Sequence, residues 1–299
     1  MNNRRGGTNP MQDLRIAAVQ MNCRVAERER NLATIERFAE AAAAQDVDIV
    51  CFPELCVCGY NAGDTSTPEP EPLEGESLRR LEEIARNCQI TLLAGILERD
   101  VSGIVYNTQV VCGPEGYVGC YRKTHVPDAE IGTWRHGDDL PVFEHAKARY
   151  GIEICYDSHF PELSTLLAEK GAEVIFLPHA SPGETPAEKR DRWMRYVPAR
   201  AYDNNVYVAI CNNVGDNGAG RTFSGVTFIC DPLGAVIAEG QSGSEEEMVV
   251  ADLSASALAE SRRETLMFFR HYRRPEMYRR WENEIGLRGD GQSTSLTGR

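Results

Sequence analysis

The stretch Asp48-Ile-Val-Cys-Phe-Pro-Glu54 is a short apolar run that ends abruptly at a carboxylate. An uninterrupted apolar run of this length suits a strand buried on both faces. Upstream, a strand pattern over 14–21 leads into a helix pattern over 31–45, and downstream a helix pattern over 77–89 leads into a strand over 90–97. Strands therefore alternate with helices in the first part of the chain, which is typical of α/β folds.

Hairpin patterns follow. The segments 105–112 and 117–123 are joined by Gly113-Pro-Glu-Gly116, where Pro in the second and Gly in the fourth position suit a type I turn. The later segment 228–237 has the same Cys-x-Pro-x-Gly pattern as 110–119, with apolar residues at matching positions. Either a faint internal repeat or two independent hairpins with common turn chemistry would explain this similarity.

Strands and helices alternate again between the two hairpins. The expected elements are a strand over 152–156, a helix over 162–170, a strand over 173–177, a helix over 186–203 and a strand over 206–211. Two sets of strands, each with its own hairpin and helices, predict an α/β fold in which two mixed sheets pack together and are covered outside by helices.

The chain is interpreted as one domain over residues 11–285, because no linker or change of composition divides it. Residues 1–10 are polar and lack the apolar segment of a secretory signal, so we expect a disordered leader. Residues 286–299 are rich in polar and small side chains, which predicts a disordered tail. No apolar run approaches the ~20 residues needed to cross a bilayer. We therefore expect a cytoplasmic protein.

Net charge and cysteine usage exclude several classes of partner. The formal charge of −13 disfavours nucleic acid and anionic membranes as partners. Ten cysteines are scattered through strand-like segments, without the Cys-x-x-Cys or His-x3-5-His spacing of a zinc site. In a reducing compartment most such thiols are small core residues. We expect neither a metal nor another cofactor.

Three predicted strands end in reactive side chains: the first in Glu54, the second in Lys123 and the third in Cys155. Strand ends in layered α/β folds hold side chains rigidly yet within reach of a ligand. A thiol can attack an amide carbonyl once a base removes its proton, and the base must come from another strand because none adjoins Cys155. A buried Glu54 with a raised pKa suits that role, and Lys123 suits stabilisation of an oxyanion.

Three motifs resemble the signatures of the nitrilase superfamily of carbon–nitrogen hydrolases. They are Phe52-Pro-Glu-Leu55 with Gly59-Tyr60, Arg122-Lys-Thr-His-Val-Pro127, and Ile154-Cys-Tyr-Asp157 with Phe160-Pro-Glu162. The resemblance covers residues 11 to about 285. It implies an α-β-β-α sandwich, a homodimer formed through helices, and a catalytic triad of Glu54, Lys123 and Cys155. It also implies a second glutamate, for which Glu130 ahead of Trp134 is the match.

Further residues are candidates for contacts with the substrate or the oxyanion. They are Tyr156, Tyr60, His179, Asn212 and Trp193. A Cys–His dyad with His125 or His159 is the alternative to the triad. We consider it the weaker one because papain-type dyads place the histidine far downstream of the cysteine.

The substrate is the point on which the sequence is least specific. Tyr156-Asp157 after the cysteine resembles the amidase-like branch of the superfamily, which favours a small non-peptide amide. An N-carbamoyl compound, a nitrile, or no reaction at all in a silent binding protein are the alternatives. Ser158 and His159 offer no clamp for a substrate carboxylate, so we expect substrates without an α-carboxylate to be preferred. Any clamp would have to come from elsewhere, with Arg190, Arg192 and Arg195 as candidates.

Overall fold

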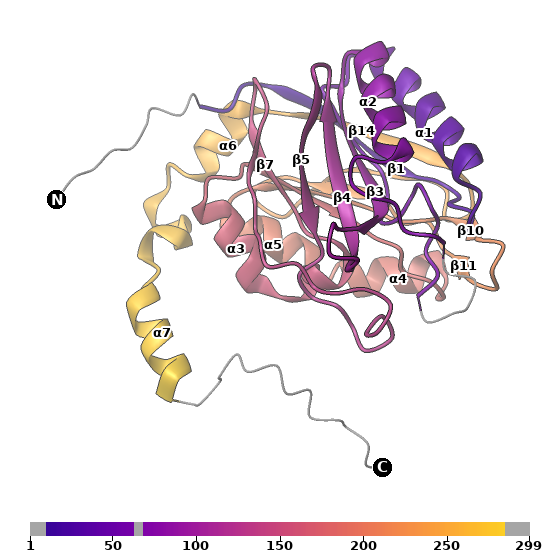
Figure 1. The fold of residues 1–299 in the computed structure, drawn as a ribbon. Coiled ribbons are helices and arrows are strands. Elements are labelled where there is room, and N and C mark those ends of the chain that lie inside the picture. Colours follow the sequence, from indigo (N-terminus) through magenta and orange to yellow (C-terminus); the bar gives the residue numbers. More distant parts are fainter. Residues whose placement is uncertain (1–9, 63–67, 285–299) are drawn as a thin grey trace.

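A computed structural model describes residues 10–62 and 68–284, and it contains two mixed six-stranded sheets (Figure 1). The predicted leader (except Pro10) and tail lie outside the described residues. The first sheet has the order β14 (Glu247–Leu253), β1 (Leu14–Gln20), β2 (Ile49–Cys51), β3 (Thr91–Arg99), β4 (Val105–Gly113) and β5 (Gly116–Arg122). The second has the order β13 (Val236–Glu239), β12 (Phe228–Cys230), β9 (Tyr207–Cys211), β8 (Val174–Pro178), β7 (Arg149–Ile152) and β6 (Phe143–Glu144). A small separate pair is formed by β10 (Gly215–Asp216) and β11 (Thr222–Phe223).

Helices cover the outer face of each sheet, as the two-sheet prediction required. The first sheet packs on α1 (Arg28–Ala43) and α2 (Glu76–Cys88), and the second on α3 (Pro161–Glu169), α4 (Pro186–Trp193) and α5 (Val197–Asn204) (Figure 1). A third apolar cluster fills the space between the sheets, with Ile49 from one sheet and Phe176 from the other among its fully buried members. The architecture is therefore the four-layer α-β-β-α sandwich.

The two sheets share one topology. In the first, β1, β2 and β3 are parallel neighbours followed by the antiparallel hairpin β4–β5. In the second, β7, β8 and β9 are parallel neighbours followed by the antiparallel hairpin β12–β13. The two hairpins that share a Cys-x-Pro-x-Gly pattern thus occupy equivalent edges, which favours the internal-repeat interpretation over the alternative of two independent hairpins.

Two predicted elements were wrong in detail. The strand expected over 152–156 ends at Ile152, because Cys155 has a φ of 51° and begins the 3₁₀ helix η1 (Cys155–His159). The single helix expected over 186–203 is broken into α4 and α5. Pro198 has no N–H to donate to a carbonyl one turn earlier, so it is tolerated only in the first turn of α5.

The chain ends in α6 (Ala255–Ser261), two short 3₁₀ segments η2 (Thr265–Met267) and η3 (Phe269–Tyr272), and α7 (Pro275–Glu284). No helix in the described residues is both long and apolar enough to span a membrane.

Candidate functional site

Glu54 lies in the turn that follows β2, and its side chain is completely buried. The turn packs directly on β3, where a Cβ added to Gly95 would lie 2.2 Å from the Leu55 nitrogen. Only glycine permits this close approach. The carboxylate accepts hydrogen bonds from Asn107 Nδ2 at 2.7 Å and from the Ala180 backbone N–H at 2.7 Å. Both sheets therefore hold Glu54 in place.

Lys123 follows β5 and is also completely buried. Its Nζ donates to Glu54 Oε1 at 2.8 Å and to both oxygens of Glu130, at 2.8 and 3.0 Å. Burial alone would lower the pKa of Lys123, but the charges of Glu54, Cys155 and Glu130 outweigh it and raise that pKa. The lysine is therefore a fixed cation between two carboxylates.

Glu130 is held by aromatic donors as well as by Lys123. Tyr60 Oη donates to Glu130 Oε1 at 2.8 Å, and Trp134 Nε1 donates to Oε2 at 3.0 Å. Burial raises the pKa of Glu130, and Lys123 opposes that effect. The Tyr60 ring packs edge-on against Trp134, with 6.1 Å between centroids. This carboxylate is thus positioned from three directions.

Cys155 lies at the start of η1, beside these charges. Burial raises the pKa of its thiol well above the usual range, Glu54 raises it further, and Lys123 opposes both effects. The turn is held by Asp157, whose carboxylate accepts from the Ile154 N–H at 2.9 Å. A carboxylate, an ammonium group and a thiol in one buried cluster can transfer a proton and support a developing negative charge.

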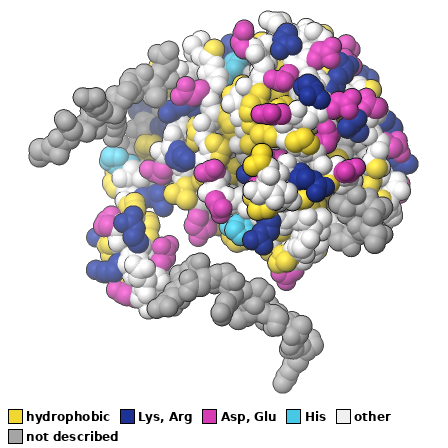
Figure 2. Space-filling model, in the orientation of Figure 1, with side chains coloured by type: hydrophobic (Ala, Val, Ile, Leu, Met, Phe, Trp, Pro, Cys, Tyr) yellow, Lys and Arg dark blue, Asp and Glu magenta, His cyan; other side chains and the backbone are white. Residues whose placement is uncertain are grey.

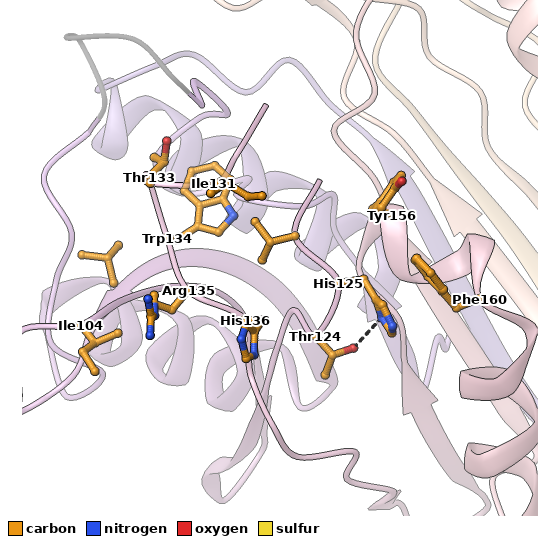
Figure 3. Close-up of a pocket in the computed structure, with 13 residues that line it drawn as sticks. Ile104, Thr124, His125, Ile131, Thr133, Trp134, Arg135, His136, Tyr156 and Phe160 are labelled. Atoms are coloured by element: carbon orange, nitrogen blue, oxygen red, sulfur yellow. Dashed lines mark hydrogen bonds between the residues drawn. The ribbon is translucent and has the colours of Figure 1, made fainter. Parts of the chain in front are cut away.

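A cavity of about 960 Å³ is lined by residues around His125, Trp134 and Tyr156 (Figure 3). Two of its lining residues adjoin the cluster, because Tyr156 follows Cys155 in the chain and Trp134 donates to Glu130. The four residues of the cluster are not themselves among the lining residues. His125 lines the same cavity but stacks on Phe160, with ring centroids 3.7 Å apart. The Nδ1 atom of His125 also lies 3.1 Å from Thr124 Oγ1 and 3.0 Å from Asp157 Oδ1, so this ring nitrogen is engaged in the turn that carries Cys155.

The structure places the remaining sequence candidates at different depths. Tyr156 is 38% exposed, whereas His179, Trp193 and Asn212 are buried. Burial lowers the pKa of His179 to about 3, so its ring is neutral, and it packs on Trp193 with 4.6 Å between centroids. Among the described residues, the Asn212 side chain hydrogen-bonds to backbone groups alone, namely the N–H and carbonyl of Ser181 and the carbonyl of Ser224.

Sequence reasoning did not identify two groups that hold Glu54, the Asn107 side chain and the Ala180 N–H. Asn107 begins a run of three polar residues, with Thr108 and Gln109, in a strand that is otherwise mostly apolar, and such a run inside a strand is a usable signal. The Ala180 contact is made by backbone and leaves no signal in the side chain. Among the described residues, no group of three or more side chains has the arrangement of a metal site.

Known proteins share both the sequence and the fold. The carbon-nitrogen hydrolase family matches residues 15–263. Human omega-amidase NIT2 is 32% identical over 280 residues, which cover 90% of this chain and 98% of that protein. A nitrilase from Pyrococcus abyssi is 33% identical over 269 residues, covering 89% and 99%. A mutant amidase of Nesterenkonia AN1, from the nitrilase superfamily, has a similar structure with a TM-score of 0.76 at 24% identity, covering 90% and 98%.

Proposed function

Because this chain belongs to the carbon–nitrogen hydrolase family, we propose that it hydrolyses a small non-peptide amide to a carboxylic acid and ammonia. The proposed nucleophile is Cys155, with Glu54 as the proton carrier, Lys123 as the oxyanion support and Glu130 as the residue that positions Lys123. The observation that carries the proposal is the buried cluster in which Lys123 Nζ contacts both glutamates and the charge of Cys155 acts on it.

In the proposed acylation step, Glu54 removes the proton of the Cys155 thiol as the sulfur attacks the amide carbon. Because the thiol pKa is raised, the resting thiol keeps its proton and deprotonation accompanies attack. The carbonyl oxygen becomes an oxyanion, which Lys123 stabilises together with the Tyr156 backbone N–H. Glu54 then returns the proton to the nitrogen, the C–N bond breaks, and ammonia leaves a thioester on Cys155.

Deacylation repeats this sequence with water. Glu54 takes a proton from the water that attacks the thioester carbon, and Lys123 again supports the oxyanion. The C–S bond breaks, the proton passes to the Cys155 sulfur, and the carboxylic acid is released. The hydrogen bonds from Asn107 and Ala180 hold the Glu54 carboxylate in one position. A fixed carboxylate can transfer the proton in both acylation and deacylation without having to be repositioned.

Three other functions compete with amide hydrolysis. A nitrile substrate is suggested by the relative from Pyrococcus abyssi, and an N-carbamoyl substrate would be attacked by the same thiol to give an S-carbamoyl enzyme in place of a thioester. A silent binding protein would not need an ammonium group buried between two carboxylates, which is costly to desolvate. Tyr156-Asp157 after the nucleophile favours the amide.

Ammonia release from primary amides, N-carbamoyl amines and nitriles tests the proposal. We expect amides to be turned over fastest and Cys155→Ala to lose activity on the order of 10⁶-fold. Cys51→Ala and Cys211→Ala, which change buried thiols elsewhere, are the matched controls. Full activity of Cys155→Ala, or nitriles outpacing the matching amides, would contradict the assignment. We place the reaction in the cytoplasm, where all ten free thiols would persist.

We further propose that the protein forms a symmetric homodimer through its C-terminal segment. Leu266, Tyr272 and Trp281 are 74%, 56% and 44% exposed, which is unusual for large apolar side chains so close in sequence. Figure 2 shows the α7 region as a lobe beside the main body, with apolar side chains among charges of both signs. Sedimentation at micromolar concentration checks this proposal, and a 33.2 kDa species would contradict it.

A further inference from the structure

The cavity that Trp134 and Tyr156 line has no part in the proposed reaction steps, although it adjoins the catalytic cluster. Three of its lining residues immediately follow a proposed catalytic residue in the chain. These pairs are Lys123-Thr124, Glu130-Ile131 and Cys155-Tyr156. Cys155 itself is partly exposed. Because consecutive Cα atoms are about 3.8 Å apart, the wall of the cavity begins one residue from the nucleophile.

The walls of the cavity are mainly aliphatic and aromatic. Ile131 and Trp134 lie on one side, and Tyr156 and Phe160 lie on the other (Figure 3). Trp134 is 4% exposed and Ile131 is 60% exposed, so apolar surface runs from the buried floor of the cavity to solvent. Exposed apolar side chains that gather around one hollow mark a binding site. The volume of about 960 Å³ is far larger than a short aliphatic amide requires.

Both aromatic sides of the cavity are fixed by contacts outside it. Trp134 Nε1 donates to Glu130 at 3.0 Å, and the indole packs edge-on against Tyr60. Phe160 stacks on His125, with ring centroids 3.7 Å apart. Aromatic rings prefer offset or edge-to-face contact with other rings, so the walls suit an aromatic ligand. Such a ligand would bind without first having to order the side chains that receive it.

The charges around the cavity exclude one class of ligand. None of the described residues that line it is acidic, although the chain contains 45 Asp and Glu residues. Arg135 lines it as well, and an ammonium group on the ligand would face a like charge there. Because Arg135 is exposed, its attraction for an anion is weak. The cavity therefore favours a neutral group and disfavours a cation.

We propose that this cavity binds an aromatic ring carried by the acyl group of the substrate while the scissile amide lies at Cys155. This inference rests on the proposed amide hydrolysis and narrows its substrates to primary amides of arylalkanoic acids. One or two methylene groups between the ring and the carbonyl would let the ring pass Tyr156 and reach Trp134. Amides whose acyl chain ends in an ammonium group are poor substrates in this assignment.

Matched substrates test the inference by ammonia release. The pairs are phenylacetamide with acetamide, and hydrocinnamamide with propionamide. In the better pair we expect kcat/KM for the aryl amide to exceed that for the alkyl amide by at least about 10-fold, since burial of an apolar group of this size supplies roughly 10–100-fold. The analogue para-(aminomethyl)phenylacetamide should fall at least about 10-fold below phenylacetamide. Preference for the alkyl amide in both pairs would overturn the inference and leave amide hydrolysis intact.

Variants at two separate places in the wall test whether the cavity causes this preference. Ile104→Glu and Ile131→Glu should each lower the aryl-to-alkyl ratio about 10-fold and improve the relative rate of the ammonium analogue. Leu233→Glu is the matched control, because Leu233 is 59% exposed in the turn between β12 and β13 and does not line the cavity.

Ile104 is adjacent to no proposed catalytic residue, so a change of ratio in Ile104→Glu cannot come from a displaced Glu130. If Ile131→Glu changes the ratio and Ile104→Glu does not, the inference is wrong. The ratio is read within each variant, so a loss of overall activity does not obscure it.

Calorimetric titration of phenylacetamide into Cys155→Ala separates this inference from the proposed function. Binding that weakens at least about 10-fold on adding Ile104→Glu, but not on adding Leu233→Glu, supports the subsite even where no amide is turned over. Absence of phenylacetamide binding, or binding indifferent to Ile104→Glu, overturns it.

Discussion

The Tyr121 hydroxyl donates a 2.8 Å hydrogen bond to Asp157 Oδ2, and this contact connects the strand that leads to Lys123 with the turn that carries Cys155. The same carboxylate accepts from Thr124 Oγ1 and from the backbone N–H groups of His125 and Ile154. Asp157 therefore fixes the separation between two of the proposed catalytic residues, although it belongs to neither strand.

Tyr121→Phe should lower both stability and turnover. The ring is kept, so the change removes a hydrogen bond to a buried carboxylate, at a cost of about 1.5–3 kcal/mol in the free energy of unfolding. Because the turn at Cys155 is then less firmly held, kcat should fall more than KM rises. Urea titration and steady-state kinetics measure both effects. Tyr117→Phe, on the exposed part of the same strand, is the control, and equal behaviour of the two variants would contradict this role.

Glu130→Gln should lose about 10²–10³ of kcat while still binding the substrate. The two oxygens of Glu130 accept hydrogen bonds from Lys123, Tyr60 and Trp134. In glutamine an NH₂ group replaces one of these oxygens, so a hydrogen-bond donor would face another donor and at least one of the contacts would be lost. Asp128→Asn, in the same loop but exposed, is the control. Full kcat in Glu130→Gln would show that Lys123 needs no second carboxylate.

The pH dependence of stability should change in Glu153→Gln. Glu153 is completely buried, and burial raises its pKa to about 8, while a hydrogen bond from Ser164 opposes that effect. The pKa of this carboxyl is higher in the folded protein than in the unfolded chain. The free energy of unfolding therefore decreases as the pH rises from the unfolded pKa of 4.5 to about 8. Within this pH range the free energy of unfolding decreases by about 1.4 kcal/mol per pH unit.

Glutamine at position 153 does not titrate, so the stability of the variant relative to wild type should rise steadily between pH 5 and pH 8. Denaturant titrations at several pH values measure the difference. A difference independent of pH would show that Glu153 is ionised throughout this range.

Hydroxylamine should intercept the acyl-enzyme formed from an amide and give the corresponding hydroxamate. The proposed thioester on Cys155 is open to attack by a nucleophile better than water. The yield should increase with hydroxylamine concentration while ammonia is still released stoichiometrically, which a colorimetric ferric assay and an ammonia assay follow together. No hydroxamate at saturating hydroxylamine would argue against a covalent intermediate.

Much of the architecture could be predicted because apolar runs and helical periodicity identify elements locally. The buried run ahead of Glu54 and the hairpin ahead of Lys123 both lie where the pattern indicated. Cys155 was placed inside a strand because a left-handed backbone leaves no mark in composition. Pro198 in the sequence was a signal for the break between Trp193 and Val197, but continuous helical patterning on both sides obscured it.

The site was predictable to the extent that its residues end strands. Glu54 and Lys123 were selected on that basis, and they are in contact. The supports that act across sheets were not predictable, because the contact of Ala180 with Glu54 depends on how one sheet packs on the other. The contact of the Arg192 side chain with Glu184 depends likewise on the residue at which α4 ends.

The left-handed backbone at Cys155, with its φ of 51°, has an evolutionary consequence. A residue with a Cβ is strained there by roughly 1–2 kcal/mol, whereas glycine is not. Selection for stability alone would favour glycine at the very position where selection for turnover demands a thiol. A descendant released from its reaction should therefore drift toward glycine at 155, and Cys155→Gly should resist denaturant better than Cys155→Ala.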